Sequence, residues 1–94
     1  MDLKGFRNQL DMIDKKIIEA IAQRFLIIKK IAEYKKKNNI PRYDLKREQE
    51  IAVKIKKMAE KEKINISFIN KIFEILLQES HQVQKDFLNE DTEV

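Results

Sequence analysis

The chain has 94 residues, 43% of them apolar, and its 20 basic and 16 acidic side chains leave a net charge of +4. These values predict a single globular domain, residues 1–94, with a modest core. The chain has no cysteine and one histidine, His81. The absence of cysteine excludes disulfides and thiolate metal sites, and the single histidine argues against a multi-histidine metal site or a Ser-His-Asp triad within one chain.

Charged side chains occur throughout residues 1–16, and the sequence contains no run of about 18 uncharged apolar residues. These features predict a cytoplasmic protein without a membrane segment. A single Gly and a single Pro, in a sequence rich in Lys, Glu, Ile, Leu and Ala, are typical of long helices. We therefore expect an all-α fold.

The first predicted helix runs from about residue 3 to residue 37. Its apolar side chains are spaced three and four residues apart, which is the pattern of a coiled-coil seam. This seam comprises Phe6, Leu10, Ile13, Ile17, Ala20, Ile27, Ile31 and Tyr34. The helix is expected to end at residues 38–41, because Asn is a weak helix former and Pro41 disfavours helix at Ile40.

Two shorter helices are predicted to follow. The second covers about residues 43–62, with Ile51, Ile55 and Met58 on its core face. The third begins after a cap at Asn65 or Ser67 and continues to about residue 89. Its apolar stripe is Ile69, Ile72, Phe73, Leu76, Val83 and Phe87. Residues 90–94 are expected to form a frayed tail.

The length of the first helix predicts a dimer. Thirty-five helical residues span roughly 52 Å, whereas a compact globule of this size has a diameter of about 32 Å. A seam that its own chain cannot cover needs a partner chain, and a symmetric pair is the commonest solution. We therefore expect three helices per chain in an intertwined helical homodimer.

Polar side chains interrupt the apolar face of each predicted helix, because spacings of three and four return to the same face. In chain order they are Arg7 at the edge of the first seam, Arg24, Lys35, Asp44, Arg47, Glu48, Ser80 and, toward the edge of the third stripe, Gln84. In the second helix the charged residues lie on the same side as Ile51 and Ile55, where a core is expected.

Most of these residues also have a purely structural interpretation. Lys35 can extend from a helix end into solvent, and Ser80 can bond back to the carbonyl of Leu76. Asp44 can favour a helix start through the helix dipole, and the Arg and Glu that follow it can form ion pairs with other helices. Gln84 can be a rim residue.

Arg24 is the hardest of the set to explain structurally, because a guanidinium in an apolar seam without an anionic partner is costly. Together the set supplies two or three guanidiniums, one ammonium, one carboxylate and two neutral hydrogen-bonding groups. Such a set suits a small ligand with more than one carboxylate and a hydroxyl. It offers no obvious nucleophile, so any catalysis would depend on positioning and electrostatic stabilisation.

The spacing of these residues resembles that of the all-α chorismate mutases. An early Arg7 is followed by Arg24 seventeen residues later and by Lys35 eleven residues after that. P-x-x-D-x-x-R-E (41–48) then opens the second helix, and S-x-x-x-Q (80–84) lies in the third. The resemblance covers about residues 5–88. No single one of these motifs is specific to the family, but the ordered set with these spacings is.

The resemblance implies a function in aromatic amino-acid biosynthesis, in the shikimate pathway. Members of this family rearrange chorismate to prephenate, a pericyclic (Claisen) isomerisation that needs no cofactor, no metal and no covalent intermediate. By analogy, Arg24 and Arg7 of the partner subunit would clamp the two carboxylates of the substrate. Ser80 would assist at the ring carboxylate, and Arg47 would line the pocket and orient both acids.

The remaining residues would act at the other polar groups of the substrate. The resemblance implies that Lys35 and Gln84 donate hydrogen bonds to the ether oxygen, where negative charge develops as the carbon–oxygen bond breaks. Glu48, with the backbone near Asp44, would hold the ring hydroxyl. His81 is assigned no role and is expected to lie in solvent or at a rim.

Three alternative functions remain open at this stage. An isochorismate pyruvate-lyase shares this fold and a similar cationic pocket, and a non-catalytic helical interaction or regulatory module could retain the fold.

A nucleic-acid-binding dimer is suggested by the positive charge and the segment YKKKNN (34–39). However, only four of the 20 basic residues are Arg, and the acids are interspersed among them. We therefore expect a solvated lysine surface and neither nucleic acid nor membrane as a partner; association with another shikimate-pathway enzyme is left open.

Overall fold

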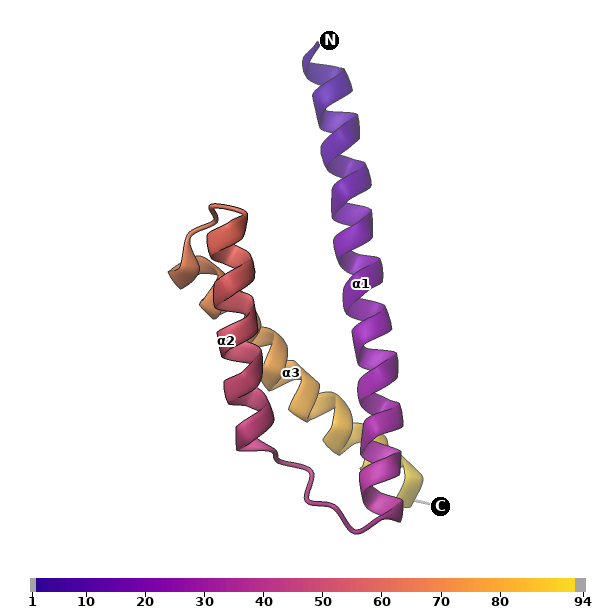
Figure 1. Ribbon diagram of the computed structural model, residues 1–94. Coiled ribbons are helices and arrows are strands. Elements are labelled where there is room, and N and C mark those ends of the chain that lie inside the picture. Colours follow the sequence, from indigo (N-terminus) through magenta and orange to yellow (C-terminus); the bar gives the residue numbers. More distant parts are fainter. Residues whose placement is uncertain (1, 93–94) are drawn as a thin grey trace.

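A computed structural model describes residues 2–92 of the chain. These residues form three helices and no strand (Figure 1), with α1 at Leu3–Lys37, α2 at Leu45–Lys61 and α3 at Ile66–Thr92. The all-α prediction is confirmed, and the first predicted helix has the observed bounds. No helix within the described residues is long and apolar enough to cross a membrane.

Each helix begins next to a side chain that caps it. The carboxylate or amide oxygen of the capping residue accepts a hydrogen bond from the backbone N–H three residues later, at 2.8 Å for Asp2, 3.0 Å for Asp44 and 3.1 Å for Asn65. Such a bond satisfies one of the donors that a helix start leaves unpaired. Because Asp44 is itself the cap, α2 starts at Leu45 rather than at residue 43.

The first two helices end in the same backbone motif. Asn39 and Lys63 each adopt a left-handed conformation, with φ of 55° and 58°. The next residue in each case, Ile40 or Ile64, donates its N–H to a carbonyl five residues earlier, at 2.9 Å. This Schellman-type closure turns the chain out of the helix without a glycine. Asparagine tolerates this conformation, as the sequence predicts at Asn39, whereas a lysine in this conformation is uncommon.

The end of α3 differs from the prediction. The helix continues to Thr92, whereas the sequence predicted its end at about residue 89; the expected fraying of the tail stays a prediction. No Gly or Pro follows Pro41 in the sequence, so no such residue interrupts α3. The helix therefore extends, because each further helical residue adds one hydrogen bond. Residues 93–94 lie outside the described part of the chain.

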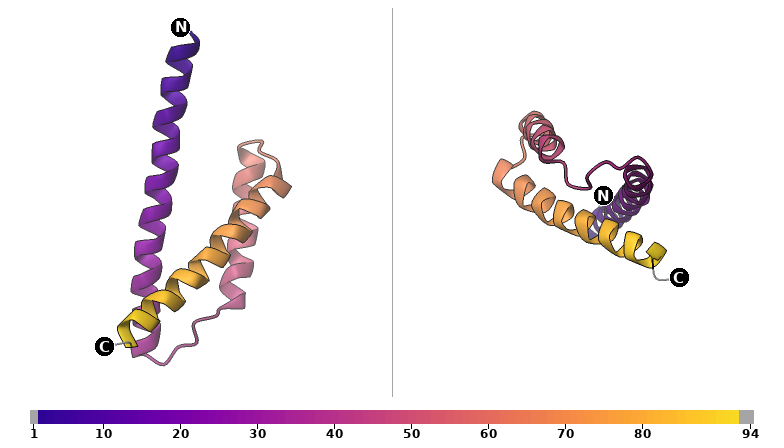
Figure 2. Two further views of the ribbon diagram at one scale, coloured as in Figure 1. Left: turned by 180° about the vertical axis from the view of Figure 1, so that it is seen from behind. Right: turned by 90° about the horizontal axis from the view of Figure 1, so that it is seen from below.

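The helix α3 holds the chain together. It packs against both α1 and α2, while α1 and α2 make no direct packing contact within the described residues. In the view along the axes of α1 and α2, α3 runs along one side of both helices (Figure 2, right). Among the residues that the structure describes, few apolar side chains are buried: Ile28 and Ala32 on α1, and Ile55 and Ala59 on α2.

The prediction that Met58 belongs to the core is wrong within this chain. Its side chain is 56% exposed, and Ala59 takes the buried position one residue later. The core face of α2 therefore follows Ile51, Ile55 and Ala59, which are spaced by four residues, so that the small alanine lies in the core of the chain.

The predicted seam of α1 is not buried by the rest of the chain. Its large side chains are between 42% exposed, at Ile31, and 62% exposed, at Tyr34. The N-terminal part of α1 extends well beyond α2 and α3 (Figure 1). The chain is 54 Å long with a radius of gyration of 16.9 Å, against about 12 Å for a compact globule of this length. A long apolar surface on α1 is thus left uncovered by its own chain.

Candidate active site

A cavity of about 240 Å³ lies between the C-terminal half of α1, the start of α2 and the C-terminal half of α3. This is slightly below the roughly 300–1,000 Å³ typical of ligand pockets. The cavity wall contains seven of the eight predicted site residues: Arg24, Lys35, Asp44, Arg47, Glu48, Ser80 and Gln84. Residues separated by up to 60 positions in the sequence thus meet in one place.

The helical repeat explains how α3 contributes to this wall. Leu77, Ser80, His81 and Gln84 follow one another at spacings of three, one and three, which place all four on one face of the helix. Ser80 and Gln84 are the buried polar residues of the described part of the chain, 4% and 8% exposed. The apolar part of the wall comes mainly from isoleucines of α1 and α2, among them Ile28 and Ile51.

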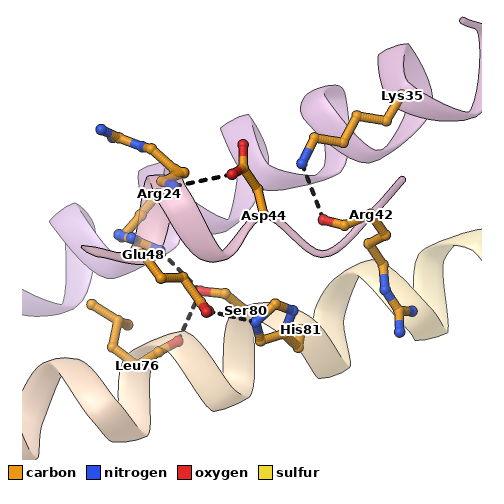
Figure 3. A network of polar contacts seen from close by, with 9 residues as sticks. Arg24, Lys35, Arg42, Asp44, Glu48, Leu76, Ser80 and His81 are labelled. Carbon is orange, nitrogen blue, oxygen red and sulfur yellow. Dashed lines mark hydrogen bonds and ion pairs between the residues drawn. The ribbon is translucent and has the colours of Figure 1, made fainter. Parts of the chain in front are cut away.

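Arg24 is partly buried and contacts a neutral group. Its Nη1 donates a hydrogen bond of 2.9 Å to the Ser80 hydroxyl, which in turn donates to the carbonyl of Leu76 at 2.8 Å (Figure 3). The back-bond of Ser80 is thus present, as the structural interpretation of the sequence predicted, and the Arg24 contact is made in addition. No carboxylate of the described residues forms an ion pair with Arg24.

The surroundings of Arg24 oppose its positive charge. Burial, and to a lesser extent the neighbouring positive charge of Arg47, lower the pKa of Arg24 below its ordinary value. Arg47 itself pairs with Glu50 on its own helix, 3.7 Å between Nη1 and Oε2. An anion entering the cavity would therefore meet a guanidinium whose charge is not compensated by the chain.

Lys35 reaches across the cavity to the loop between α1 and α2. Its Nζ donates a hydrogen bond of 3.0 Å to the carbonyl of Arg42 (Figure 3). The ammonium group is therefore fastened to the loop rather than extended freely into solvent, and it lies on the cavity wall. The next residues of the loop lead to Asp44, whose carboxylate is occupied by capping α2.

Glu48 contacts a residue to which the sequence assigned no role. The Nε2 atom of His81 lies 2.7 Å from Oε1 of Glu48 (Figure 3), and because a carboxylate only accepts, the imidazole donates. The ring of His81 stacks on that of Tyr43, with centroids 5.2 Å apart and 17° between the planes. His81 was expected in solvent or at a rim, and it is half-buried on the cavity wall.

Tyr43 also interacts with Glu48. A hydrogen bond to the Glu48 carboxylate, then the repulsion from its negative charge and a small loss of solvation, raise the pKa of Tyr43 above its ordinary value. The position of His81 could have been predicted, because it follows Ser80 and precedes Gln84 by three residues on the same helical face. Arg42 and Tyr43 precede the helix, where the periodicity gives no direction.

Gln84 is buried with an unsatisfied acceptor. Its Oε1 has no solvent access and no hydrogen-bond partner among the described residues. Leaving a buried polar atom unpaired costs about 1–3 kcal/mol. A group of this kind on a cavity wall indicates that its partner comes from outside the chain, as a ligand or a second subunit.

Arg7 is the one predicted site residue that lies outside the cavity. It occupies the exposed N-terminal part of α1. The helix rises about 1.5 Å per residue, so the seventeen residues between Arg7 and Arg24 separate them by about 26 Å along the axis of α1. Arg7 therefore cannot reach the cavity of its own chain.

The charges around the cavity favour an anionic ligand. Four cationic side chains line it, namely Arg24, Lys35, Arg42 and Arg47, against two carboxylates. Both carboxylates are already engaged, one in capping α2 and the other with an imidazole. The Ser80 hydroxyl donates to a backbone carbonyl, so no base of the described residues activates it as a nucleophile.

Comparison with known proteins assigns the chain to a family. The model of the family "Chorismate mutase type II" matches residues 6–85. The chain belongs to this family. Its members include enzymes of the shikimate pathway, and the match extends from the start of α1 to one residue beyond Gln84 on α3.

Two kinds of relatives from this comparison differ in length. The chorismate mutase of Methanocaldococcus jannaschii is 35% identical over 88 residues, which are 94% of this chain and 89% of that protein. The bifunctional chorismate mutase/prephenate dehydratase of Buchnera aphidicola subsp. Schizaphis graminum is 36% identical over 88 residues. A second such protein, from Buchnera aphidicola subsp. Baizongia pistaciae, is 35% identical over 86 residues. The chain spans 23% of the length of each of these bifunctional relatives.

Proposed function

We propose that the chain is a chorismate mutase, an isomerase that rearranges chorismate to prephenate. The observation that carries this proposal is Arg24, a half-buried guanidinium that faces the cavity beside a neutral hydroxyl and a second cation. Chorismate carries two carboxylates, one hydroxyl and an enol ether. Its negative charges match the cations of the cavity wall, and its size suits a small pocket.

The carboxylates of the substrate are bound by guanidiniums. Arg24 takes one carboxylate, and its neighbour Ser80 adds a hydroxyl contact to the ring carboxylate. Arg47 releases its exposed, weak pairing with Glu50 and orients the acids, since a pairing of this kind on a helix surface contributes only about 0.3–0.5 kcal/mol. The second guanidinium of the clamp is Arg7 of the partner subunit.

Lys35 and Gln84 act on the ether oxygen. Both side chains lie on the cavity wall, and an ammonium and an amide can each donate a hydrogen bond. Lys35 exchanges its contact with the Arg42 carbonyl for one with the substrate. The bonds strengthen as negative charge grows on the ether oxygen, so they stabilise the transition state more than the bound substrate.

Glu48 and the backbone near Asp44 hold the ring hydroxyl. A carboxylate has two oxygens and several acceptor positions, so a contact between His81 and Oε1 leaves Oε2 for the substrate. Holding the hydroxyl and both carboxylates folds the substrate into the chair that the reaction requires. The protein thus contributes orientation and electrostatic stabilisation, and the bonds that form and break all belong to the substrate.

The functional unit in this proposal is a homodimer. The apolar seam of α1 is exposed, and Arg7 cannot reach its own cavity. A second copy with the opposite direction of α1 meets both requirements, because symmetric pairing covers the seam and brings each Arg7 toward the other cavity. Each active site is then built from two chains.

An isochorismate pyruvate-lyase is the alternative on the same fold, since it uses a similar cationic pocket. One assay separates these activities. The purified chain is incubated with chorismate and with isochorismate, and the products are identified by chromatography. We expect chorismate to be consumed and prephenate to form. Release of pyruvate from isochorismate without turnover of chorismate would contradict the proposal, and loss of neither substrate would favour a non-catalytic module.

A further inference from the structure

The position of Glu48 raises an electrostatic question. Its carboxylate shares the cavity wall with three guanidiniums and an ammonium: Arg24, Arg42, Arg47 and Lys35. Opposite charges in a partly desolvated pocket attract strongly, and bidentate pairing with a guanidinium is favourable for a carboxylate. A freely rotating Glu48 would therefore neutralise one of the cations that the substrate needs.

The structure shows a different arrangement. Glu48 Oε1 is bonded to His81 Nε2 at 2.7 Å, and Glu48 forms no ion pair with an arginine or lysine among the described residues. The nearby cations have other partners: the Ser80 hydroxyl for Arg24 and the exposed carboxylate of Glu50 for Arg47. The imidazole on α3 thus holds the carboxylate away from the guanidiniums.

The loop before α2 fixes the imidazole in turn. The rings of Tyr43 and His81 are stacked, and the phenol also interacts with Glu48, which raises the pKa of Tyr43. Three residues from the loop, α2 and α3 therefore form a closed set of contacts. Removal of the imidazole would break two of these contacts at once.

We propose that His81, supported by Tyr43, is a positioning residue that keeps the Glu48 carboxylate off the arginines of the cavity. This leaves the cations available for a dianionic substrate and presents Glu48 Oε2 to the substrate hydroxyl. The inference rests on the proposed function, in that it assigns the dianion to the cations and the hydroxyl to Glu48. His81 itself does not contact the substrate in this proposal.

Steady-state kinetics on chorismate test the role. In His81→Leu, Glu48 turns toward a guanidinium and competes with the substrate, so we expect KM to rise about tenfold, equivalent to about 1.4 kcal/mol. The value of kcat changes much less, because Lys35 and Gln84 are intact. His81→Gln keeps an N–H donor and should restore most of the lost affinity. Gln82→Leu, a neighbouring exposed position, is the matched control and should leave KM unchanged.

A double-mutant comparison separates positioning from packing. In a Glu48→Gln background there is no carboxylate to misplace, so His81→Leu should have little further effect on KM. An unchanged KM in His81→Leu, or an equal rise in KM with and without the Glu48 carboxylate, would overturn the proposal.

Nuclear magnetic resonance provides a readout that does not depend on turnover. His81 is the only histidine of the chain, so the imidazole nitrogens give a single set of signals. We expect the Nε2 signal to shift in Glu48→Gln and to stay in place in Glu60→Gln, an exposed acid further along α2. Failure of Nε2 to respond would refute the pairing itself. Absence of turnover by the wild-type chain would refute the proposed function, while the resonance comparison would still decide the pairing.

Discussion

Arg24 shows how a single side chain can prepare a small protein for an anionic ligand. The chain places a guanidinium beside a hydroxyl and another cation, and burial lowers the pKa of Arg24. Such a position is unfavourable for an empty protein, since a desolvated charge needs an anionic partner. It becomes favourable once a carboxylate enters, so part of the binding energy of the ligand is prepared in the folded chain.

Lys35 and Gln84 are the residues on which turnover should depend most. We expect Lys35→Ala and Gln84→Ala each to lower kcat about 10²–10³-fold, because removing one donor to a developing oxyanion typically costs about 3–4 kcal/mol. The circular dichroism spectrum should be unchanged. Lys29→Ala, an exposed lysine of the same helix outside the cavity wall, is the control. Near-normal turnover in both cavity variants would contradict the assignment.

The chemical type of the donor at Gln84 has a consequence for pH dependence. An amide donates at any ordinary pH, whereas a carboxylic acid donates only while it is protonated. We therefore expect the kcat of the wild-type chain to vary little from mildly acidic to mildly basic pH. In Gln84→Glu, kcat should be retained at low pH and fall as pH rises through the titration of the new carboxyl. A wild-type kcat that falls steeply above about pH 6 would contradict this role.

Helical periodicity was sufficient to predict most of the cavity wall. Arg24, Lys35, Glu48 and Ser80 were found because each interrupts an apolar stripe, and the cavity contains all of them. The pairing of Glu48 with His81 was not predictable, because a periodicity places a residue on a face but does not say which neighbour its side chain selects.

At the scale of the helices, the caps determine where the cavity walls begin. Asp44 fixes the first turn of α2 through its bond to a backbone N–H, and this turn carries two further wall residues. The sequence located the helix breaks well, because Asn39, Pro41 and Asn65 are strong local signals. It placed the start of α2 two residues early, since a cap and a first helical residue look alike in a periodic pattern.

The two caps at Asp44 and Asn65 allow a matched comparison of stability and activity. We expect Asp44→Ala and Asn65→Ala each to lower the free energy of unfolding by about 1 kcal/mol, measured in urea, because each loses a capping bond. Only Asp44→Ala should also reduce turnover of chorismate, since Asn65 lies away from the cavity. Asp44→Asn retains a capping side chain and should preserve stability. Equal effects of both alanine variants on turnover would contradict the role of Asp44 at the cavity.

At the scale of the whole molecule, one chain is incomplete. Its described residues bury only four apolar side chains, and large apolar residues along the whole of α1 remain exposed. The sequence predicted this from helix length, and the extent of 54 Å agrees with that estimate. The sequence did not show which apolar face of α1 is buried within the chain. Ile28 and Ala32 pack on α3, and the predicted seam lies beside them. The face on α3 closes one chain, and the exposed part of the seam is the surface that the proposed second chain would cover.

The central claim is that two chains share each site in which chorismate rearranges. The most direct measurement mixes two inactive variants, Arg7→Ala and Arg24→Ala, after joint unfolding and refolding, and assays turnover of chorismate. A mixed dimer combines Arg7 from one chain with Arg24 from the other in one of its two cavities. We expect about a quarter of the wild-type activity per chain, since half of the randomly formed dimers are mixed and each has one intact site. A mixture no more active than either variant alone would contradict the shared site.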